Sequence, residues 1–148
     1  SALGYAEDLK LFMAINNAED CHGFQTDLDR LQEWLNLFLR HKFNLNVNKC
    51  KTITFSRSKN PIKHNYQIGG HELERVNEYK DLGVYMDSKM TFSNHIETIT
   101  AKSARMLGFI KRISKEFEDY YALKTLFVTL VRPNLEYASV VWSLRAIE

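Results

Sequence analysis

The spacing of apolar residues changes at Thr91, and this change divides the chain into two kinds of structure. Before Thr91, outside residues 20–42, apolar and polar residues alternate in short runs, a period of two that is typical of half-buried strands. After it, apolar residues recur every three or four positions, as on one face of a helix. They are Phe92, Ile96, Ile99, Met106, Ile110, Ile113 and Phe117. The sequence therefore predicts an α+β chain with a long helix after residue 91.

Two further segments have helical spacing. Apolar residues recur every three or four positions across residues 20–42 and again across residues 120–131. The second of these helices should stop before Pro133, because a residue that precedes proline disfavours the helical conformation. A third, shorter helix should follow it. Asn94 and Glu97 are arranged like a capping box, which predicts the start of the long helix.

Glycines and acidic residues mark two hairpin turns in the first part of the chain. Gly69 and Gly70 lie between two short alternating runs, which predicts a tight turn, and the sequence lacks the lysine-containing pattern of a phosphate-binding loop. Glu7 and Asp8 follow Tyr5 beside another alternating run. Adjacent carboxylates on a rigid strand are suited to holding divalent cations, and a solvated hairpin tip explains the same pattern.

Composition bounds the size and the compartment of the protein. The 148 residues suffice for one domain or two small subdomains, and a hydrophobic content of 45% supports a core. No apolar run reaches the roughly 18 residues of a membrane span, so we expect an intracellular protein, nuclear or cytoplasmic, with no membrane partner. Cys21 and Cys50 lack paired metal-ligand spacing and are expected to be free thiols.

Charge is distributed unevenly along the chain. The net charge is only +2, but residues 1–48 carry 4 Lys or Arg and 7 acidic side chains, whereas residues 49–148 carry 16 and 11. A basic second part is compatible with binding to a nucleic-acid backbone, and equally with an ordinary solvated surface.

Five short motifs occur in a fixed order along the chain. They are DLDRLQEW at 27–34, LNVNKC at 45–50, KDLGV at 80–84, LGFI at 107–110 and LVRPNLEYA at 130–138. Together with the acidic pair after Tyr5, they resemble the reverse transcriptase of non-LTR (LINE-type) retrotransposons. The resemblance runs from about Tyr5 to Trp142, which is nearly the whole chain.

The resemblance implies an α+β fold, a partial polymerase palm followed by an all-α thumb. Residues 1–90 would be the C-terminal part of the palm, with antiparallel hairpins packed on a helix and a primer-grip-like hairpin, and residues 91–148 would be a three-helix thumb. The family's fingers and first palm half have no counterpart here, so they would be partners supplied upstream or in trans. The other implied partners are an RNA template and a DNA primer, bound as an RNA–DNA hybrid.

Glu7 and Asp8 stand where the family has catalytic, metal-binding aspartates, in the pattern Tyr-Ala-Asp-Asp. The family enzyme binds Mg²⁺ or Mn²⁺ there. Glu7 is one methylene longer than aspartate, and because Mg²⁺ requires near-octahedral geometry at roughly 2.0–2.1 Å, the longer side chain is expected to displace the metal. Either an impaired metal site or no cofactor in this chain fits that difference.

Lys49 is the next catalytic candidate that the resemblance implies. A lysine after the palm helix in this family lies near the incoming triphosphate and can protonate the departing pyrophosphate. A solvated surface charge is the alternative.

Asp81, Leu82 and Gly83 fall in the motif with which the family holds the primer 3′ end. Gly83 would permit close approach of a sugar-phosphate, while Leu82 and Val84 would anchor the hairpin below it. An ordinary hairpin on the domain core has the same sequence pattern.

Basic residues gather on the long helix, away from its apolar face. A thumb helix would present them to a nucleic-acid duplex and neutralise phosphates without reading the sequence. The solvated face of an amphipathic helix is the alternative. The residues are Lys102, Arg105, Lys111, Arg112 and Lys115.

Three hypotheses of function follow. The first is a portion of an RNA-directed DNA polymerase, whose intact form carries out two-metal nucleotidyl transfer and which is inactive as this isolated chain. The second is a domesticated or degenerate remnant that acts as a nucleic-acid- or protein-binding module, which Glu7 favours. The third is a remnant with no retained function.

Overall fold

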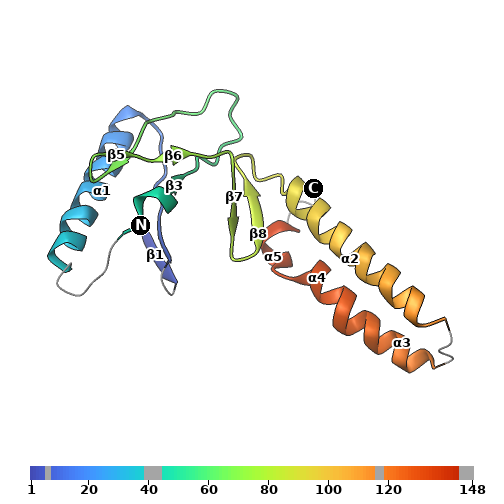
Figure 1. Cartoon of the computed structure of the whole chain (residues 1–148). Coiled ribbons are helices and arrows are strands. Elements are labelled where there is room, and N and C mark those ends of the chain that lie inside the picture. Colours follow the sequence, from blue (N-terminus) through green and yellow to red (C-terminus); the bar gives the residue numbers. More distant parts are fainter. Residues whose placement is uncertain (6–7, 39–44, 116–118, 144–148) are drawn as a thin grey trace. The chain divides into compact units, whose positions relative to one another are not determined.

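The computed structural model describes residues 1–5, 8–38, 45–115 and 119–143, and the chain divides into two compact units, Ser1–Asn77 and Glu78–Glu148 (Figure 1). Helices and strands are mixed, which confirms the α+β prediction. Among the described residues, no helix combines the length and the apolar character needed to cross a membrane.

The first unit consists of paired short strands and one long helix. Strands β1 and β2 form an antiparallel hairpin, as do β4 and β5, whereas β3 pairs with β6 in parallel. The elements are β1 (Ala2–Tyr5), β2 (Asp8–Leu11), α1 (Ala18–Phe38), the 3-10 turn η2 (Val47–Lys49), β3 (Lys51–Thr52), β4 (Gln67–Ile68), β5 (His71–Glu72) and β6 (Glu74–Arg75).

Helix α1 begins with a reciprocal pair of side-chain caps. The Asn17 Oδ1 atom accepts a hydrogen bond from the Asp20 backbone N–H at 2.8 Å, and the Asp20 Oδ2 atom accepts one from the Asn17 backbone N–H at 3.2 Å. These bonds satisfy backbone donors that lack a partner within the helix. The predicted helix over residues 20–42 is confirmed as far as Phe38, and residues 39–42 lie outside the described residues.

The core of the first unit lies between α1 and the β4–β5 hairpin. Its buried residues are Leu28, Tyr66, Ile68 and Leu73, with Leu11, Phe24, Leu45, Val47 and Cys50 packed around them. The Gln25 side chain also pairs with the backbone of Gln67, donating to its carbonyl at 2.9 Å and accepting from its N–H at 3.0 Å. The Gln25 side chain of α1 therefore makes with β4 the pair of backbone hydrogen bonds that a neighbouring strand would otherwise make.

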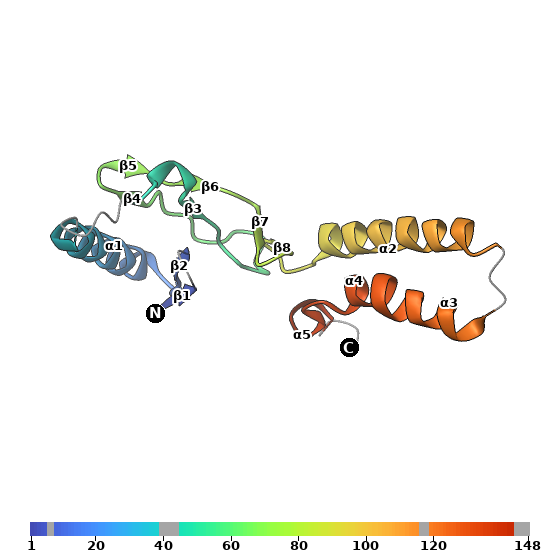
Figure 2. The ribbon, with the colours of Figure 1, turned by 60° about the horizontal axis from the view of Figure 1, so that its bottom comes forward.

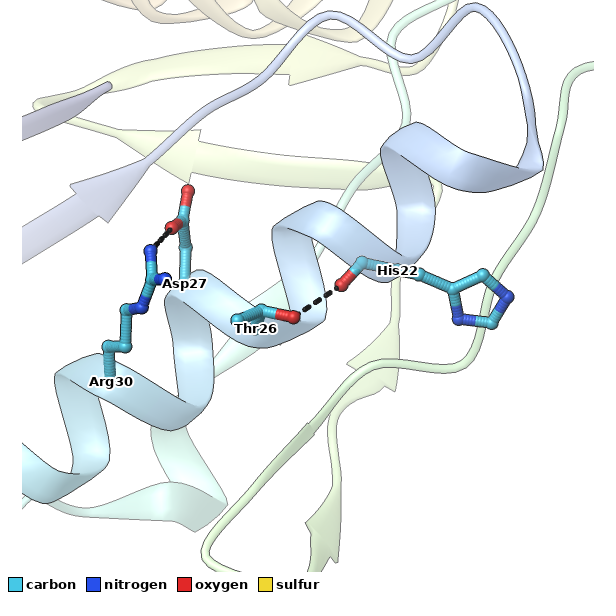
Figure 3. Close-up of polar contacts among 4 residues, drawn as sticks. All are labelled: His22, Thr26, Asp27 and Arg30. Carbon is cyan, nitrogen blue, oxygen red and sulfur yellow. Dashed lines mark hydrogen bonds and ion pairs between the residues drawn. The ribbon is translucent and has the colours of Figure 1, made fainter.

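The other face of α1 is exposed, and its polar side chains contact neighbouring turns of the helix, while the His22 ring also meets the His64 ring edge-on, with the centroids 5.4 Å apart (Figure 3). The Thr26 hydroxyl donates to the His22 carbonyl at 3.0 Å, and Arg30 lies 3.4 Å from Asp27. Exposed ion pairs of this kind contribute little to stability, about 0–1 kcal/mol.

The turn between β4 and β5 is the one predicted at Gly69-Gly70. Both glycines have positive φ angles, 58° and 78°, and Ile68 pairs with His71 across the turn. A two-residue hairpin turn of type I′ requires positive φ angles at both of its central residues. The predicted tight turn is confirmed.

The second unit is a β-hairpin followed by helices. Helix α2 lies beside the run formed by α3, η3 and α4, in opposite chain direction (Figures 1 and 2). The elements are β7 (Glu78–Asp81), β8 (Val84–Asp87), α2 (Ser93–Ile113), α3 (Tyr120–Leu126), the π-helical turn η3 (Phe127–Val131), α4 (Arg132–Glu136) and α5 (Ser139–Trp142). The long helix predicted after residue 91 is α2.

The capping box predicted at Asn94 and Glu97 is wrong. Helix α2 starts at Ser93 with Phe92 as its N-cap, two residues earlier than a cap at Asn94 would place it, and the Asn94 side chain hydrogen-bonds to Glu78. The start of α2 is held instead by Asp87, whose Oδ2 atom accepts from the Thr91 N–H at 2.8 Å and from the Phe92 N–H at 2.7 Å. A carboxylate outside the helix therefore does the work that the sequence pattern assigned to Asn94.

The predicted stop before Pro133 is also wrong, since α4 contains Pro133 in its first turn. The π-helical turn η3 precedes it, and the Arg132 N–H bonds to the Phe127 carbonyl five residues earlier. Proline lacks an N–H and clashes with the carbonyl four residues before it, so a widened turn accommodates it without ending the helix.

Candidate functional site

Of the predicted acidic pair, the structure places Asp8, which lies in the first hairpin. Tyr5 pairs with Asp8 across β1 and β2, so Asp8 is the first residue of β2. Glu7 lies outside the described residues. Within the part of the chain that the structure describes, no group of three or more His, Cys, Asp or Glu side chains could hold a metal ion. The described residues therefore supply no complete ligand set for Mg²⁺.

Lys49 is the last residue of η2, on the surface of the first unit. Its backbone N–H donates to the Asn46 carbonyl at 2.9 Å, while Val47 and Cys50 on either side of it pack against the core. Burial raises the pKa of the Cys50 thiol. This alternation of inward and outward residues directs Lys49 to solvent, which fits both of its predicted roles.

The β7–β8 hairpin places Leu82 and Gly83 at its tip. Asp81 pairs with Val84, and the two residues between them have positive φ angles of 44° and 89°. Val84 is buried and anchors the hairpin as predicted, but Leu82 does not, because its side chain is 52% exposed. A left-handed residue at the tip directs its side chain away from the core face on which Val84 lies.

The tip also contacts the C-terminal helices of the same unit. The Tyr137 hydroxyl donates to the Leu82 carbonyl at 2.8 Å. A Cβ atom on Gly83 would lie 3.3 Å from the Tyr137 ring, so glycine permits this close approach.

The predicted basic residues all lie exposed on or just after α2. At about 100° per residue, Lys102, Arg105 and Arg112 fall within an arc of roughly 80°, and Lys111 extends it to roughly half of the helix circumference. Residues 93–113 contain one acidic residue, Glu97. Helix α2 therefore carries a positive face directed to solvent.

Phe109 is a further residue of this face that the sequence reasoning missed as a site residue. Its side chain is 45% exposed, and with Lys102, Arg105 and Met106 it lines a shallow, largely apolar hollow. An aromatic ring between basic side chains suits contact with sugars or bases beside phosphates. The signal was in the sequence, since Phe109 follows Arg105 by one helical turn.

The buried side of α2 contains polar atoms that have no hydrogen-bond partner among the described residues. His95 and Ser103 are 2% and 5% exposed. Among the described residues, neither ring nitrogen of His95 nor the Ser103 hydroxyl has a hydrogen-bond partner. Burial lowers the pKa of His95, because the charged imidazolium would lose its hydration.

Burial also acts on Asp87, which joins β8 to α2. Burial alone would raise the pKa of its carboxyl group, but the hydrogen bonds from Thr91, Phe92 and Lys89 favour the ionised form and lower the pKa overall. The ionised carboxylate is therefore part of the structure that connects the hairpin to the basic helix.

Comparison with known proteins finds relatives of one kind. The chain is 28% identical over 149 residues to the RNA-directed DNA polymerase from mobile element jockey of Drosophila funebris, an alignment that covers 96% of this chain and 15% of the relative. It is 23% identical over 146 residues to the probable RNA-directed DNA polymerase from transposon BS of Drosophila melanogaster, covering 96% and 16%.

A jockey polymerase of Drosophila melanogaster is 27% identical over 128 residues, which cover 84% of this chain and 13% of that protein. No family model and no solved structure matches the chain. The relatives confirm the resemblance to non-LTR retrotransposon reverse transcriptases that the motifs indicate. The chain spans only 13–16% of the length of these curated relatives.

Proposed function

We propose that this chain is the palm–thumb portion of the RNA-directed DNA polymerase of a non-LTR retrotransposon, and that its second unit grips an RNA–DNA hybrid. The exposed basic face of α2 carries this proposal. In the same helical projection, Arg105 and Arg112 lie roughly 140–180° from the buried Ser103 and Ile110, and Lys102 lies at the border of the basic face, about 20° from His95. A solvated face built only for solubility would mix both signs of charge, whereas this one has a single acidic residue.

The geometry of α2 suits a duplex backbone. Lys102, Arg105 and Arg112 succeed one another along one side of a helix of 21 residues, which is about 30 Å long. Cations spaced along such a rod can neutralise successive phosphates without reading the base sequence. Phe109, between Lys102 and Arg105 in the helical projection, would add an apolar contact to a sugar or a base edge.

The tip of the β7–β8 hairpin is the proposed site of the primer 3′ end. Leu82 and Gly83 have positive φ angles and are exposed, so the part of their backbone that Tyr137 does not contact is open to a sugar-phosphate. Asp81 at the end of β7 would border the same site. This assignment of Asp81, Leu82 and Gly83 rests on the resemblance together with the exposure of the tip.

Catalysis by the intact polymerase would need divalent cations, which stabilise charge and lower the pKa of the attacking hydroxyl group. Glu7 and Asp8 stand at the positions of metal ligands, and Lys49 at the position of the acid for pyrophosphate. A displacement of about 1 Å at a reacting centre can cost on the order of a hundredfold in rate. We therefore infer that Glu7 impairs the site and that the isolated chain does not extend a primer.

A second candidate function is a nucleic-acid-binding remnant without polymerase activity, which the Glu7 substitution favours. The two candidates differ in one test. Glu7→Asp in the chain joined to the fingers and first palm half of a jockey-type polymerase should restore primer extension if the rest of the site is intact. Absence of extension in that variant, with hybrid binding retained, would select the remnant.

Binding of the purified chain to a labelled RNA–DNA hybrid tests the proposed grip. We expect the wild type to bind at low salt, and the triple change of Lys102, Arg105 and Arg112 to Ala to weaken binding roughly tenfold or more, because three phosphate contacts are lost. The matched control changes Arg57, Lys59 and Lys63 to Ala, which removes the same charge from exposed positions of the first unit.

The control triple variant should bind nearly as tightly as the wild type. Equal losses in both triple variants would mean that net charge alone drives binding, and no binding by the wild type would contradict the proposed function. Circular dichroism of each variant verifies that the helices remain folded.

A further inference from the structure

The next-to-last residue of the motif at 130–138 is a tyrosine, Tyr137, that touches the proposed primer site. The Tyr137 hydroxyl donates to the Leu82 carbonyl at 2.8 Å, a contact between residues 55 positions apart. Its ring lies 3.3 Å from the position that a Cβ atom on Gly83 would occupy. Tyr137 therefore contacts both residues of the hairpin tip, one by a hydrogen bond and one by packing.

The position of Tyr137 is itself fixed by the helices around it. Its N–H donates to the Pro133 carbonyl at 3.1 Å, and its carbonyl accepts from the Trp142 indole N–H at 2.9 Å. Ala138, the next residue, has a φ angle of 52°, so the chain turns sharply directly after Tyr137. Hydrogen bonds therefore fix the Tyr137 backbone at both its N–H and its carbonyl group.

Trp142 connects this turn to the buried face of α2. Its ring makes an edge contact with the His95 ring, with the centroids 5.6 Å apart. His95 is almost fully buried, so the tryptophan is anchored against a rigid part of the unit. A continuous set of contacts runs from His95 through Trp142 and Tyr137 to Leu82 and Gly83.

One residue at the tip needs such support. Leu82 is a non-glycine residue with a positive φ angle, a conformation that costs roughly 1–2 kcal/mol for a residue with a Cβ atom. The Tyr137 hydroxyl donates directly to the carbonyl of this residue. The hydroxyl of Tyr137 is placed to hold this strained carbonyl in one orientation.

We propose that Tyr137 is a positioning residue that orders the Leu82–Gly83 turn, and that Trp142 and His95 hold it in place, so that the C-terminal helices set the geometry with which the turn receives a primer 3′ end. The part concerning the primer rests on the proposed function. The part concerning the order of the turn stands on the contacts alone.

The first test measures the turn directly in the full chain without nucleic acid. Tyr137→Phe removes the hydroxyl and keeps the ring. We expect the ¹⁵N order parameters of Leu82 and Gly83 to fall from about 0.85, typical of rigid backbone, to below about 0.6, while those of α2 do not change. Trp142→Phe, which removes the indole N–H, should act in the same direction.

Tyr120→Phe is the matched control, because it removes the same atom from a side chain that is 69% exposed in the same unit. It should leave the turn unaffected. Order parameters of Leu82 and Gly83 that are the same in Tyr137→Phe as in the wild type would overturn the inference.

The second test uses an RNA–DNA hybrid whose primer ends in 4-thiothymidine, with the crosslinked peptide identified by mass spectrometry. We expect Tyr137→Phe to lower crosslinking to residues 81–83 about fivefold, the equivalent of one lost hydrogen bond. The affinity for the hybrid should change less than about twofold, because phosphate contacts on α2 supply it. A merely destabilised unit would lower both.

The two tests separate failure of the inference from failure of the proposed function. If the wild type binds no hybrid, or crosslinks elsewhere than residues 81–83, the proposed primer site is wrong, and the order parameters still decide whether Tyr137 orders the turn. If the crosslink forms at the turn equally well in Tyr137→Phe and in the wild type, the positioning role is wrong and the primer site stands.

Discussion

His95 is the residue whose chemistry conflicts most with its surroundings. Its ring nitrogens are buried and have no hydrogen-bond partner among the described residues, and burial lowers its pKa. In the unfolded chain a histidine binds a proton at about pH 6.5. Between that pH and the lower native pKa the unfolded state binds more protons, so stability must fall as the pH is lowered through this window.

His95→Leu should therefore flatten the pH dependence of the unfolding free energy below about pH 6.5, because the buried titrating group is gone. Denaturant titrations at pH 7.5, 6.5 and 5.5 would measure it. The exposed His71→Leu is the control and should retain the wild-type slope. A slope in His95→Leu equal to that of the wild type would contradict this account.

Asp87 should be the residue on which the start of α2 depends most. Asp87→Ala removes an acceptor shared by the Thr91 and Phe92 N–H groups, so we expect the unfolding free energy to fall by about 1–2 kcal/mol. Thermal unfolding followed by circular dichroism would measure it. Asp27→Ala, on the solvated face of α1, should cost much less, since it loses one exposed ion pair.

The lowered pKa of Asp87 fixes the sign of its pH dependence. Its stabilisation is present above the unfolded value of about 3.9 and is lost as the pH falls from there through the native pKa. Asp87→Ala and the wild type should therefore approach each other in stability at the acidic end of this window. A difference that persists unchanged there would mean that the Asp87 charge is unimportant.

At the scale of elements, two glycine substitutions separate the cost of backbone strain from the cost of crowding a neighbouring side chain. Gly83→Ala introduces a Cβ atom both at a φ angle of +89° and 3.3 Å from the Tyr137 ring. Gly70→Ala has a φ angle of +78° but no atom within 4 Å. Both should lose roughly 1–2 kcal/mol to backbone strain, and Gly83→Ala should lose more.

Denaturant titration of the two glycine variants, together with the ¹⁵N spectrum of residues 81–84, would test this. Equal losses of unfolding free energy in the two variants would show that the Tyr137 ring moves to accommodate the extra methyl group. Its contact with Gly83 would then constrain the turn little.

The elements were predictable where the apolar period is long and local. Helices α1 and α2 follow directly from their repeating apolar residues, and the Gly69-Gly70 turn follows from its glycines. The ends of the helices were not predictable, because several nearby side chains can cap the same backbone groups. The capping pattern was read at Asn94, while a reciprocal cap of the same kind occurs at Asn17 and Asp20.

Pro133 shows a different limit of local reasoning. Its effect on the preceding residues depends on whether the helix can widen, and the π-helical turn η3 provides that widening. A pattern of residue types does not contain this information, because the gain comes from packing of the run against α2.

At the scale of the whole molecule, the site was predictable only in part. The basic residues of α2 followed from helical spacing, and Phe109 could have been found by the same projection. The contact of Tyr137 with Leu82 could not, because it joins positions 55 residues apart whose proximity is decided by tertiary packing. Glu7 lies outside the described residues, so the acidic turn stays a prediction.

The account of the whole chain rests on the claim that α2 neutralises phosphates of an RNA–DNA hybrid. The most direct test is the affinity for the hybrid across a salt series, compared between the wild type and the triple change of Lys102, Arg105 and Arg112 to Ala. We predict that the slope of log affinity against log salt becomes shallower by about 2–3 in the triple variant, near 0.9 for each lost phosphate contact. An unchanged slope would contradict the claim, because it would place the phosphates elsewhere on the protein.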